Sequence, residues 1–160
     1  KADRPLAENI KNQIEIRLPR PMMNSRDYDF SFSGLKTAVL REFNKLKSLN
    51  KLNNEVISLL AYEIQESITD VLVKKTLVAA NKYKVKSIQI GGGVAANNRL
   101  KEKFISALNQ PPFVNRQQLF VPPHSLCTDN AAYIGSFAYF HNHPKSWKEI
   151  NSNPDLTVEV

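Results

Sequence analysis

The sequence predicts an α/β fold, and three features support that prediction. Its second half alternates short extended segments with helical ones, in the order strand, helix, strand, helix. Residues 35–90 contain no internal glycine or proline, which permits long helices there. With 160 residues, 42% of them hydrophobic and 23% charged, the chain has the composition of a globular domain that can bury a core. Strands and helices in this order pack in layers, with a right-handed crossover between parallel strands.

The first half of the chain contains two segments with strand character and one helix. Residues 14–18 are short, apolar in alternation and ended by prolines, which favours a short strand. In residues 28–32 three aromatic side chains alternate with polar ones, the pattern of a half-buried strand. After the Ser-Gly pair at 33–34, residues 35–47 read as a helix.

A long amphipathic helix is predicted next, with Asn53 or Asn54 as its N-cap and its end near Lys82. Asp70 and Lys74 are spaced to form a favourable pair one turn apart on this helix.

Two further strand-and-helix pairs follow the long helix. The first strand, 87–90, leads through three glycines to a helix capped by Asn97 or Asn98. That helix runs to about Leu108, with Leu100, Phe104, Ile105 and Leu108 expected on one apolar face. The second strand, 118–121, is followed by a helix from Asp129 to about His141, with Thr128 as its expected cap.

Charge and cysteine content limit the classes of partner and compartment. The formal charge of +7 is compatible with an anionic partner such as RNA or nucleotide, and equally with a lysine-rich solvated surface. Cys127 is the single cysteine, so neither an intramolecular disulfide nor a cysteine-based zinc site is expected. No apolar run reaches the length of a membrane span. We therefore expect a cytoplasmic protein without membrane contact.

The first candidate site is the glycine turn in the run I-Q-I-G-G-G-V-A-A-N, residues 88–97. A strand, a glycine turn and a helix start can bring backbone N–H groups to an anionic ligand, and glycine lets that ligand approach closely. A plain tight turn explains the glycines equally well, and Asn97 would then be an ordinary helix cap.

The second candidate is Asp129 in the run C-T-D-N-A-A, residues 127–132. Its carboxylate could be a metal ligand in a cleft, or it could simply stabilise a helix N-terminus. A third run, D-F-S-F-S-G-L-K-T at residues 29–37, offers Ser33 and Lys36 as phosphate contacts, although Ser33 could also be a helix cap.

In this order and spacing, the three runs closely resemble the C-terminal half of the tRNA N6-adenosine threonylcarbamoyltransferase family. The residue run F-S-F-S-G-L-K-T is similar to that of the bacterial TsaD type of this family, formerly called O-sialoglycoprotein endopeptidase. The resemblance implies a two-lobed actin-like/Hsp70-like (RNase H-like) ATPase fold, of which residues 1–160 would be the C-terminal portion, mostly the C-terminal lobe.

The resemblance also implies a function. Such enzymes move threonylcarbamoyl from threonylcarbamoyl-AMP to N6 of adenosine 37 in tRNAs reading ANN codons. By this resemblance Gly92 and Gly93 would line the nucleotide cleft, Asn97 would contact the adenylate, and Asp129 would ligate one divalent metal ion, iron or zinc. ATP or threonylcarbamoyl-AMP would be the nucleotide, with tRNA and TsaB-like and TsaE-like proteins as partners.

The chain departs from the family pattern in several respects: the family's opening strand with a phosphate-facing Asp, its later acidic and glycine substrate residues, and one of its motifs are missing. The other metal ligands of the family come from an H-x-x-x-H motif, and no such spacing occurs here. We therefore expect part of a larger enzyme, inactive in threonylcarbamoyl transfer by itself. The alternative is a non-catalytic scaffold paralogue of the same fold that binds a homologous partner.

Overall fold

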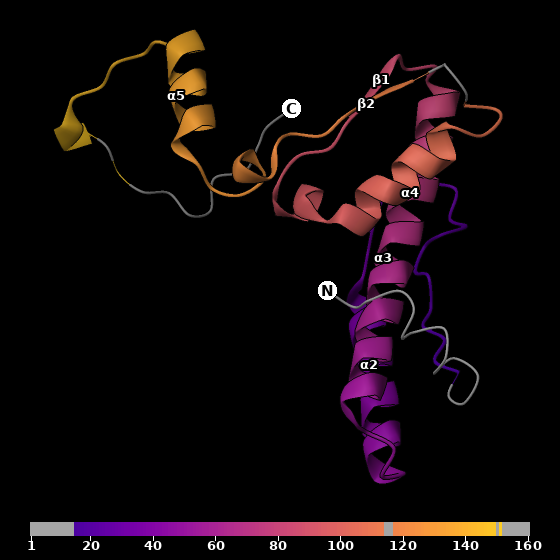
Figure 1. Cartoon of the computed structure of the whole chain (residues 1–160). Helices are drawn as coiled ribbons and strands as arrows, with labels where there is room; N and C mark the ends of the chain where they lie inside the picture. The colour runs from indigo at the N-terminus through magenta and orange to yellow at the C-terminus, as the bar shows by residue number, and fades with distance from the viewer. Residues whose placement is uncertain (1–14, 114–116, 150, 152–160) are drawn as a thin grey trace.

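The computed structural model describes residues 15–113, 117–149 and 151 of the chain. Two α-helices, a strand, a third α-helix, a second strand and a fourth α-helix follow one another, and Figure 1 shows the fourth helix set apart from the others. The elements are, in chain order, α2 (Ser33–Ser48), α3 (Asn54–Lys82), β1 (Ser87–Gln89), the 3-10 helix η1 (Gly93–Ala96), α4 (Asn98–Leu108), β2 (Gln118–Phe120), the 3-10 helix η2 (His124–Leu126), α5 (Ala131–Phe140) and the 3-10 helix η3 (Trp147–Glu149).

The long helix α3 is the central element of the fold, and its prediction is confirmed. Asn53 is its cap: the side-chain oxygen accepts a hydrogen bond from the Val56 backbone N–H at 2.8 Å, so Asn54 becomes the first helical residue. Because α3 has 29 residues, its two halves can belong to different hydrophobic clusters.

Two hydrophobic clusters lie along α3. The first joins α2 and the N-terminal half of α3 to an extended N-terminal segment, with Ile16, Leu18, Leu35, Leu46, Val56, Leu59 and Leu60 buried. The second joins the C-terminal half of α3 to α4 and the sheet, with Val73, Leu77, Ala80, Ile88, Leu100, Phe104 and Leu108 buried. The second cluster fixes the elements that lead into and out of the glycine turn.

The two strands pair in parallel, as a strand–helix–strand unit requires. Ile88 lies opposite Leu119 in the register. The pairing continues past β1, because the Ile90 N–H donates to the Phe120 carbonyl at 3.0 Å. Helix α4 packs against α3 and the sheet through Leu100, Phe104 and Leu108, as predicted. The fourth residue of the predicted face, Ile105, is 44% exposed and does not share the buried face. The sheet therefore holds the residue just before the glycines in a defined place.

The strands predicted for residues 14–18 and 28–32 were wrong within the described part of the chain. Residues 15–18 are extended and alternate in burial, but they lie along α3 and pair with no strand; Ile14 is outside the described residues. Instead, the Leu18 N–H donates to the Glu63 carboxylate at 3.3 Å. Residues 28–32 are also irregular, and Phe30 is 45% exposed. At residues 15–18 the period of two marks the side chains that are buried, but they pack against a helix, and at residues 28–32 Phe30 does not follow the period.

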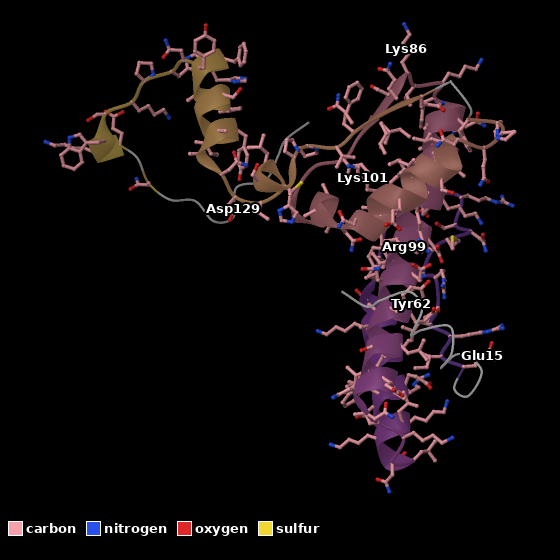
Figure 2. All side chains as sticks on the ribbon, viewed as in Figure 1. Glu15, Tyr62, Lys86, Arg99, Lys101 and Asp129 are labelled. Atoms are coloured by element: carbon pink, nitrogen blue, oxygen red, sulfur yellow. The ribbon has the colours of Figure 1, made fainter. Side chains whose placement is uncertain are left out.

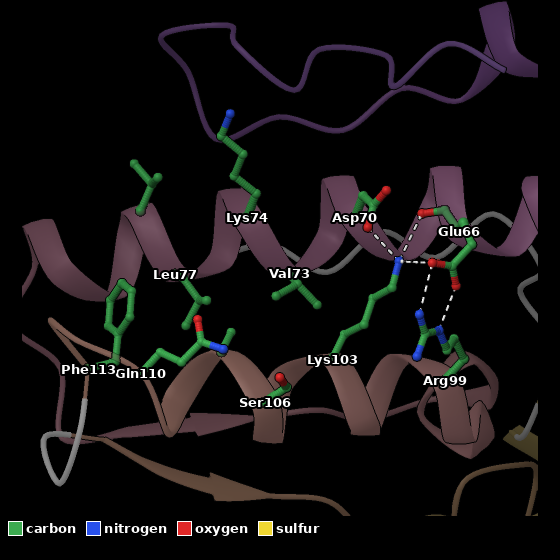
Figure 3. Close-up of a pocket in the computed structure, with 12 residues that line it drawn as sticks. Glu66, Asp70, Val73, Lys74, Leu77, Arg99, Lys103, Ser106, Gln110 and Phe113 are labelled. Atoms are coloured by element: carbon green, nitrogen blue, oxygen red, sulfur yellow. Dashed lines mark hydrogen bonds and ion pairs between the residues drawn. The ribbon is translucent and has the colours of Figure 1, made fainter. Parts of the chain in front are cut away.

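An ion-pair network connects α3 to α4 (Figure 3). Glu66 receives two hydrogen bonds from the Arg99 guanidinium, at 2.5 and 2.9 Å, and lies 3.0 Å from the Lys103 ammonium. Lys103 also pairs with Asp70, which lies 3.1 Å from the Arg20 guanidinium. Burial by itself would raise the pKa of Glu66, but the hydrogen bonds and charges of Arg99 and Lys103 outweigh it and lower that pKa to about 2.

The expected pair between Asp70 and Lys74 does not form in the structure. Asp70 points toward α4 and the N-terminal segment, and the Lys74 ammonium donates to the Asn24 side-chain oxygen at 2.9 Å. Figure 3 shows the Lys74 side chain directed away from α4.

Among residues 15–113, 117–149 and 151, no helix has the length and apolar character needed to cross a bilayer.

Candidate functional site

The glycine turn follows directly from the sheet. Gly92 has φ +77° and ψ 178°, a backbone conformation that residues with a side chain rarely adopt. The Gly92 carbonyl then accepts a hydrogen bond from the Ala95 N–H at 3.0 Å, which closes the short helix η1. The turn leads into a 3-10 helix, and α4 begins at Asn98 with Asn97 as its cap, which confirms one of the two predicted caps.

The second motif forms a corner between η2 and α5. Asn130, and not the predicted Thr128, caps α5: its side-chain oxygen accepts from the N–H groups of Ala132 and Tyr133 at 3.0 and 3.2 Å. Asp129 therefore precedes the cap and is not needed to begin the helix. Asp129 is therefore not the cap, but its carboxylate still lies beside the positive end of α5, so stabilisation of the helix N-terminus stays open as its explanation.

These two motifs border one cavity of about 420 Å³. Its lining residues come from the glycine turn and from the corner before α5: Gly92, Gly93, Leu126, Cys127, Thr128, Asp129 and Tyr133. Among the described residues that line it, Asp129 carries the one charged side chain at neutral pH. Figure 2 places Asp129 at the exposed approach to α5, well away from Arg99 and Lys101 on α4.

Cys127 and Tyr133 shape the Asp129 side of the cavity. The Cys127 thiol is buried and lies 3.5 Å from the Pro123 carbonyl oxygen, as a cysteine that packs like a small apolar side chain does. The Tyr133 hydroxyl donates to the Asp129 carboxylate at 3.5 Å, the outer limit for such a bond. Tyr133 was missed by sequence reasoning, although its position four residues after Asp129 at a helix start was a usable signal.

Asn97 is not among the residues that line this cavity. Its side-chain oxygen accepts from the Leu100 N–H at 3.1 Å, so it caps α4, and its amide donates to the Gln65 side chain at 3.4 Å. The position of Asn97 is thus fixed by α3 and α4 together. Its contact with an adenylate stays a prediction.

The third motif lies elsewhere. Ser33 and Lys36 are exposed residues in the first turn of α2 and do not line the cavity. No side-chain cap bond forms at the start of α2, where Phe32 precedes the helix, so the capping role considered for Ser33 was wrong.

The described residues do not by themselves make a metal site. A protein site for iron or zinc ordinarily uses at least three side-chain ligands. No group of three histidine, cysteine, aspartate or glutamate side chains with suitable spacing occurs within 15–113, 117–149 and 151. Asp129 can offer one oxygen ligand, and further ligands would have to come from beyond the described part of the chain.

Comparison with known proteins gives the family. The family model described as "TsaD: tRNA N6-adenosine threonylcarbamoyltransferase" matches residues 2–136. The chain is 42% identical over 147 residues to a protein of that name from Geobacillus thermodenitrificans, covering 89% of this chain and 41% of the relative. It is 38% identical over 160 residues to the protein of that name from Persephonella marina, covering 97% of this chain and 42% of the relative.

A third relative of the same name, from Syntrophomonas wolfei, is 37% identical over 139 residues, covering 87% of this chain and 39% of the relative. The chain thus spans about two fifths of the length of these curated relatives. Residues 2–136 include all three motifs as well as the cavity formed by the last two. The chain belongs to the tRNA N6-adenosine threonylcarbamoyltransferase (TsaD) family and matches the C-terminal portion of its members.

Proposed function

We propose that this chain forms the nucleotide-binding edge of a tRNA N6-adenosine threonylcarbamoyltransferase with a two-lobed actin-like ATPase fold. The complete enzyme would move threonylcarbamoyl from threonylcarbamoyl-AMP to N6 of adenosine 37 in tRNAs reading ANN codons. The observation that supports this most is the shared cavity, with Gly92 and Gly93 on one side and Asp129 on the other. Its volume of about 420 Å³ is in the range of small-molecule sites.

Each side of the cavity has a distinct role in this proposal. The backbone at Gly92 and Gly93 would approach the phosphate or ribose of the nucleotide, because no Cβ separates a ligand from the main chain. Asp129 would give one oxygen to a divalent cation, iron or zinc, held jointly with residues outside the described part. Such a cation, when bound, would supply positive charge next to the nucleotide.

The reaction itself is an acyl transfer. The N6 amine of adenosine attacks the carbamoyl carbonyl carbon, a C–N bond forms, the bond to the phosphate oxygen of AMP breaks, and the amine loses a proton. The contribution we assign to this chain is to hold the AMP portion still while the amine approaches, which lowers the entropic barrier to reaction. No side chain of the described residues is assigned the proton transfer.

Partners and compartment follow from the same proposal. The formal charge of +7 supports contact with the phosphate backbone of tRNA. TsaB-like and TsaE-like proteins would complete the assembly. A cytoplasmic location agrees with a single cysteine that forms no disulfide within the chain.

Calorimetric titration with ATP and magnesium tests the nucleotide-binding claim. The chain is expected to bind, and Gly93→Val is expected to weaken binding because its side chain would project toward the ligand. Glu42→Gln, which alters an exposed pair with Lys45 on α2, is the matched control and should bind like the unmodified chain. Equal affinity for all three proteins would refute the assignment of the cavity.

Activity is tested separately. The chain alone is expected not to transfer threonylcarbamoyl to tRNA, and transfer at the rate of a complete family member would refute that expectation. The non-catalytic scaffold remains the alternative, because the described residues supply fewer than three metal-ligating side chains at the cavity. A scaffold would bind a homologous partner protein without binding ATP.

A further inference from the structure

Helix α5 is apolar and yet exposed along its whole length. All ten of its residues are exposed, including Ile134 at 62%, Phe137 at 64% and Phe140 at 76%. Tyr139, also in α5, is 79% exposed, and Trp147 in η3 is 78% exposed. Figure 1 shows why: α5 stands apart from α2, α3 and α4 and contacts neither hydrophobic cluster.

Such a helix requires a covering surface. A helix that is apolar on all sides is found buried, and the sequence of α5, A-A-Y-I-G-S-F-A-Y-F, contains one polar residue and no charged residue. An isolated helix of ten residues is also marginal in water, even with a cap such as Asn130. The Phe137 ring stacks on His141 at 4.1 Å between centroids, but this contact is within the same segment and hides little of the surface.

The chemistry of α5 argues against a membrane as the covering surface. Ten residues are too few to cross a bilayer. Helices that lie on a membrane surface carry a strongly charged or basic face, and α5 has no charged side chain in Ala131–Phe140. A surface of aromatic and aliphatic side chains instead fits the interior of a folded protein.

The length of the relatives indicates which polypeptide supplies that interior. About three fifths of each curated relative lies outside the region that this chain matches. The family match itself extends to residue 136, so the first six residues of α5 belong to the shared architecture. We propose that α5 is the docking surface for the part of a TsaD polypeptide that precedes the matched region, whether joined to this chain or supplied as a separate protein.

Docking at α5 would also affect the cavity. Tyr133 belongs to α5 and lines the cavity beside Asp129, so a polypeptide seated on α5 would lie next to both. The proposal rests on family membership and on the exposure of α5, and it holds whether or not the cavity binds a nucleotide.

The test is co-expression of the full chain with the part of the Geobacillus thermodenitrificans relative that precedes the aligned region, carrying an affinity tag. The two polypeptides are expected to be recovered together from the soluble fraction, and to stay together in buffer without added nucleotide or tRNA. Phe137→Asp and Ile134→Asp are expected to weaken the complex by about 30-fold or more, as for loss of a buried apolar anchor. Leu40→Asp on α2, where the leucine is 61% exposed, is the matched control and should leave binding unchanged.

Several outcomes would overturn the docking proposal. Failure to recover a complex, equal weakening by the α5 and α2 substitutions, or no weakening by either α5 substitution would show that α5 is not the docking surface. Sedimentation of the chain alone as a dimer that Phe137→Asp dissociates would identify a second copy as the occupant. Circular dichroism of each variant checks that α2, α3 and α4 remain folded. Complex formation without ATP binding would leave the docking intact and contradict only the nucleotide site.

Discussion

Glu66 links the fold to the site, because its contacts with Arg99 and Lys103 hold α4 against α3. The substitution Glu66→Gln removes the carboxylate that both cations share. A pKa lowered from 4.5 to about 2 corresponds to about 3 kcal/mol of preferential stabilisation of the ionised form. Since the side chains of Glu66, Arg99 and Lys103 remain 13–19% exposed, solvent screening reduces this to about 2 kcal/mol.

The assay is urea unfolding of the chain followed by circular dichroism at pH 7. Glu66→Gln is expected to lower the free energy of unfolding by about 2 kcal/mol. Glu42→Gln removes an exposed pair with Lys45 at 3.1 Å and should cost about 0.5 kcal/mol or less. Equal losses for the two variants would refute the claim that the ion-pair network between α3 and α4 stabilises the chain more than an exposed ion pair does.

The pH dependence gives an independent check on Glu66. Its pKa is lowered in the folded state, so its stabilisation is fully present above the unfolded value near 4.5 and is lost as the pH falls toward about 2. The difference in stability between the unmodified chain and Glu66→Gln should therefore be constant above about pH 5.5 and shrink below it. A difference that does not change between pH 7 and pH 3 would contradict the assigned cause.

Three other predictions concern the turn, the corner and the central helix. Gly92→Ala is expected to lower the free energy of unfolding, measured in urea, by about 1–3 kcal/mol because Gly92 has a φ of +77°. Gly93→Ala should change it little, because there is open space around a Cβ at Gly93. Equal effects would contradict the turn geometry. In calorimetry with EDTA, Asp129→Asn is expected to bind ATP at least as tightly as the unmodified chain, because a negative charge is removed. With a divalent cation present, it is expected to bind ATP about tenfold more weakly than the unmodified chain. An effect that does not depend on the cation would exclude Asp129 as a metal ligand. Asn53→Ala should cost about 1 kcal/mol of unfolding free energy and Asn54→Ala much less, and the reverse order would reassign the cap of α3.

Helix positions could be read from the sequence because they depend on local signals. The cap, the apolar period and the absence of glycine and proline fixed α3 to within a residue at its start, and both strands around α4 were placed within a residue or two. The start of α5 was placed two residues early, since Thr128, Asp129 and Asn130 are all acceptable caps and sequence does not decide which side chain turns inward.

Long-range partners could not be read in the same way. Residues 15–18 have the alternation of a strand, but their neighbour is a helix, which no local pattern reveals. Asp70 was paired with Lys74 on its own helix, whereas in the structure it faces Lys103. One signal was available: Glu66 and Asp70 repeat like charge one turn apart on α3, and Arg99 and Lys103 do the same on α4, which favours pairing between the helices.

The candidate site was anticipated as a set of residues more than as a geometry. The resemblance to the family named Gly92, Gly93 and Asp129, and the structure brings these three to one cavity. Asn97 was named with them and lies outside that cavity as a helix cap. Nothing local in the sequence distinguishes an asparagine that caps a helix from one that caps it and also binds a ligand.

The most direct test of the shared cavity is residue-resolved NMR of the isotopically labelled chain during titration with ATP and magnesium. The account predicts that the backbone amide signals of Gly92, Gly93, Thr128 and Asp129 shift together and follow one binding curve, while those of α2 stay in place. Shifts confined to the glycine turn, shifts confined to the segment before α5, or no shifts at either segment would contradict it.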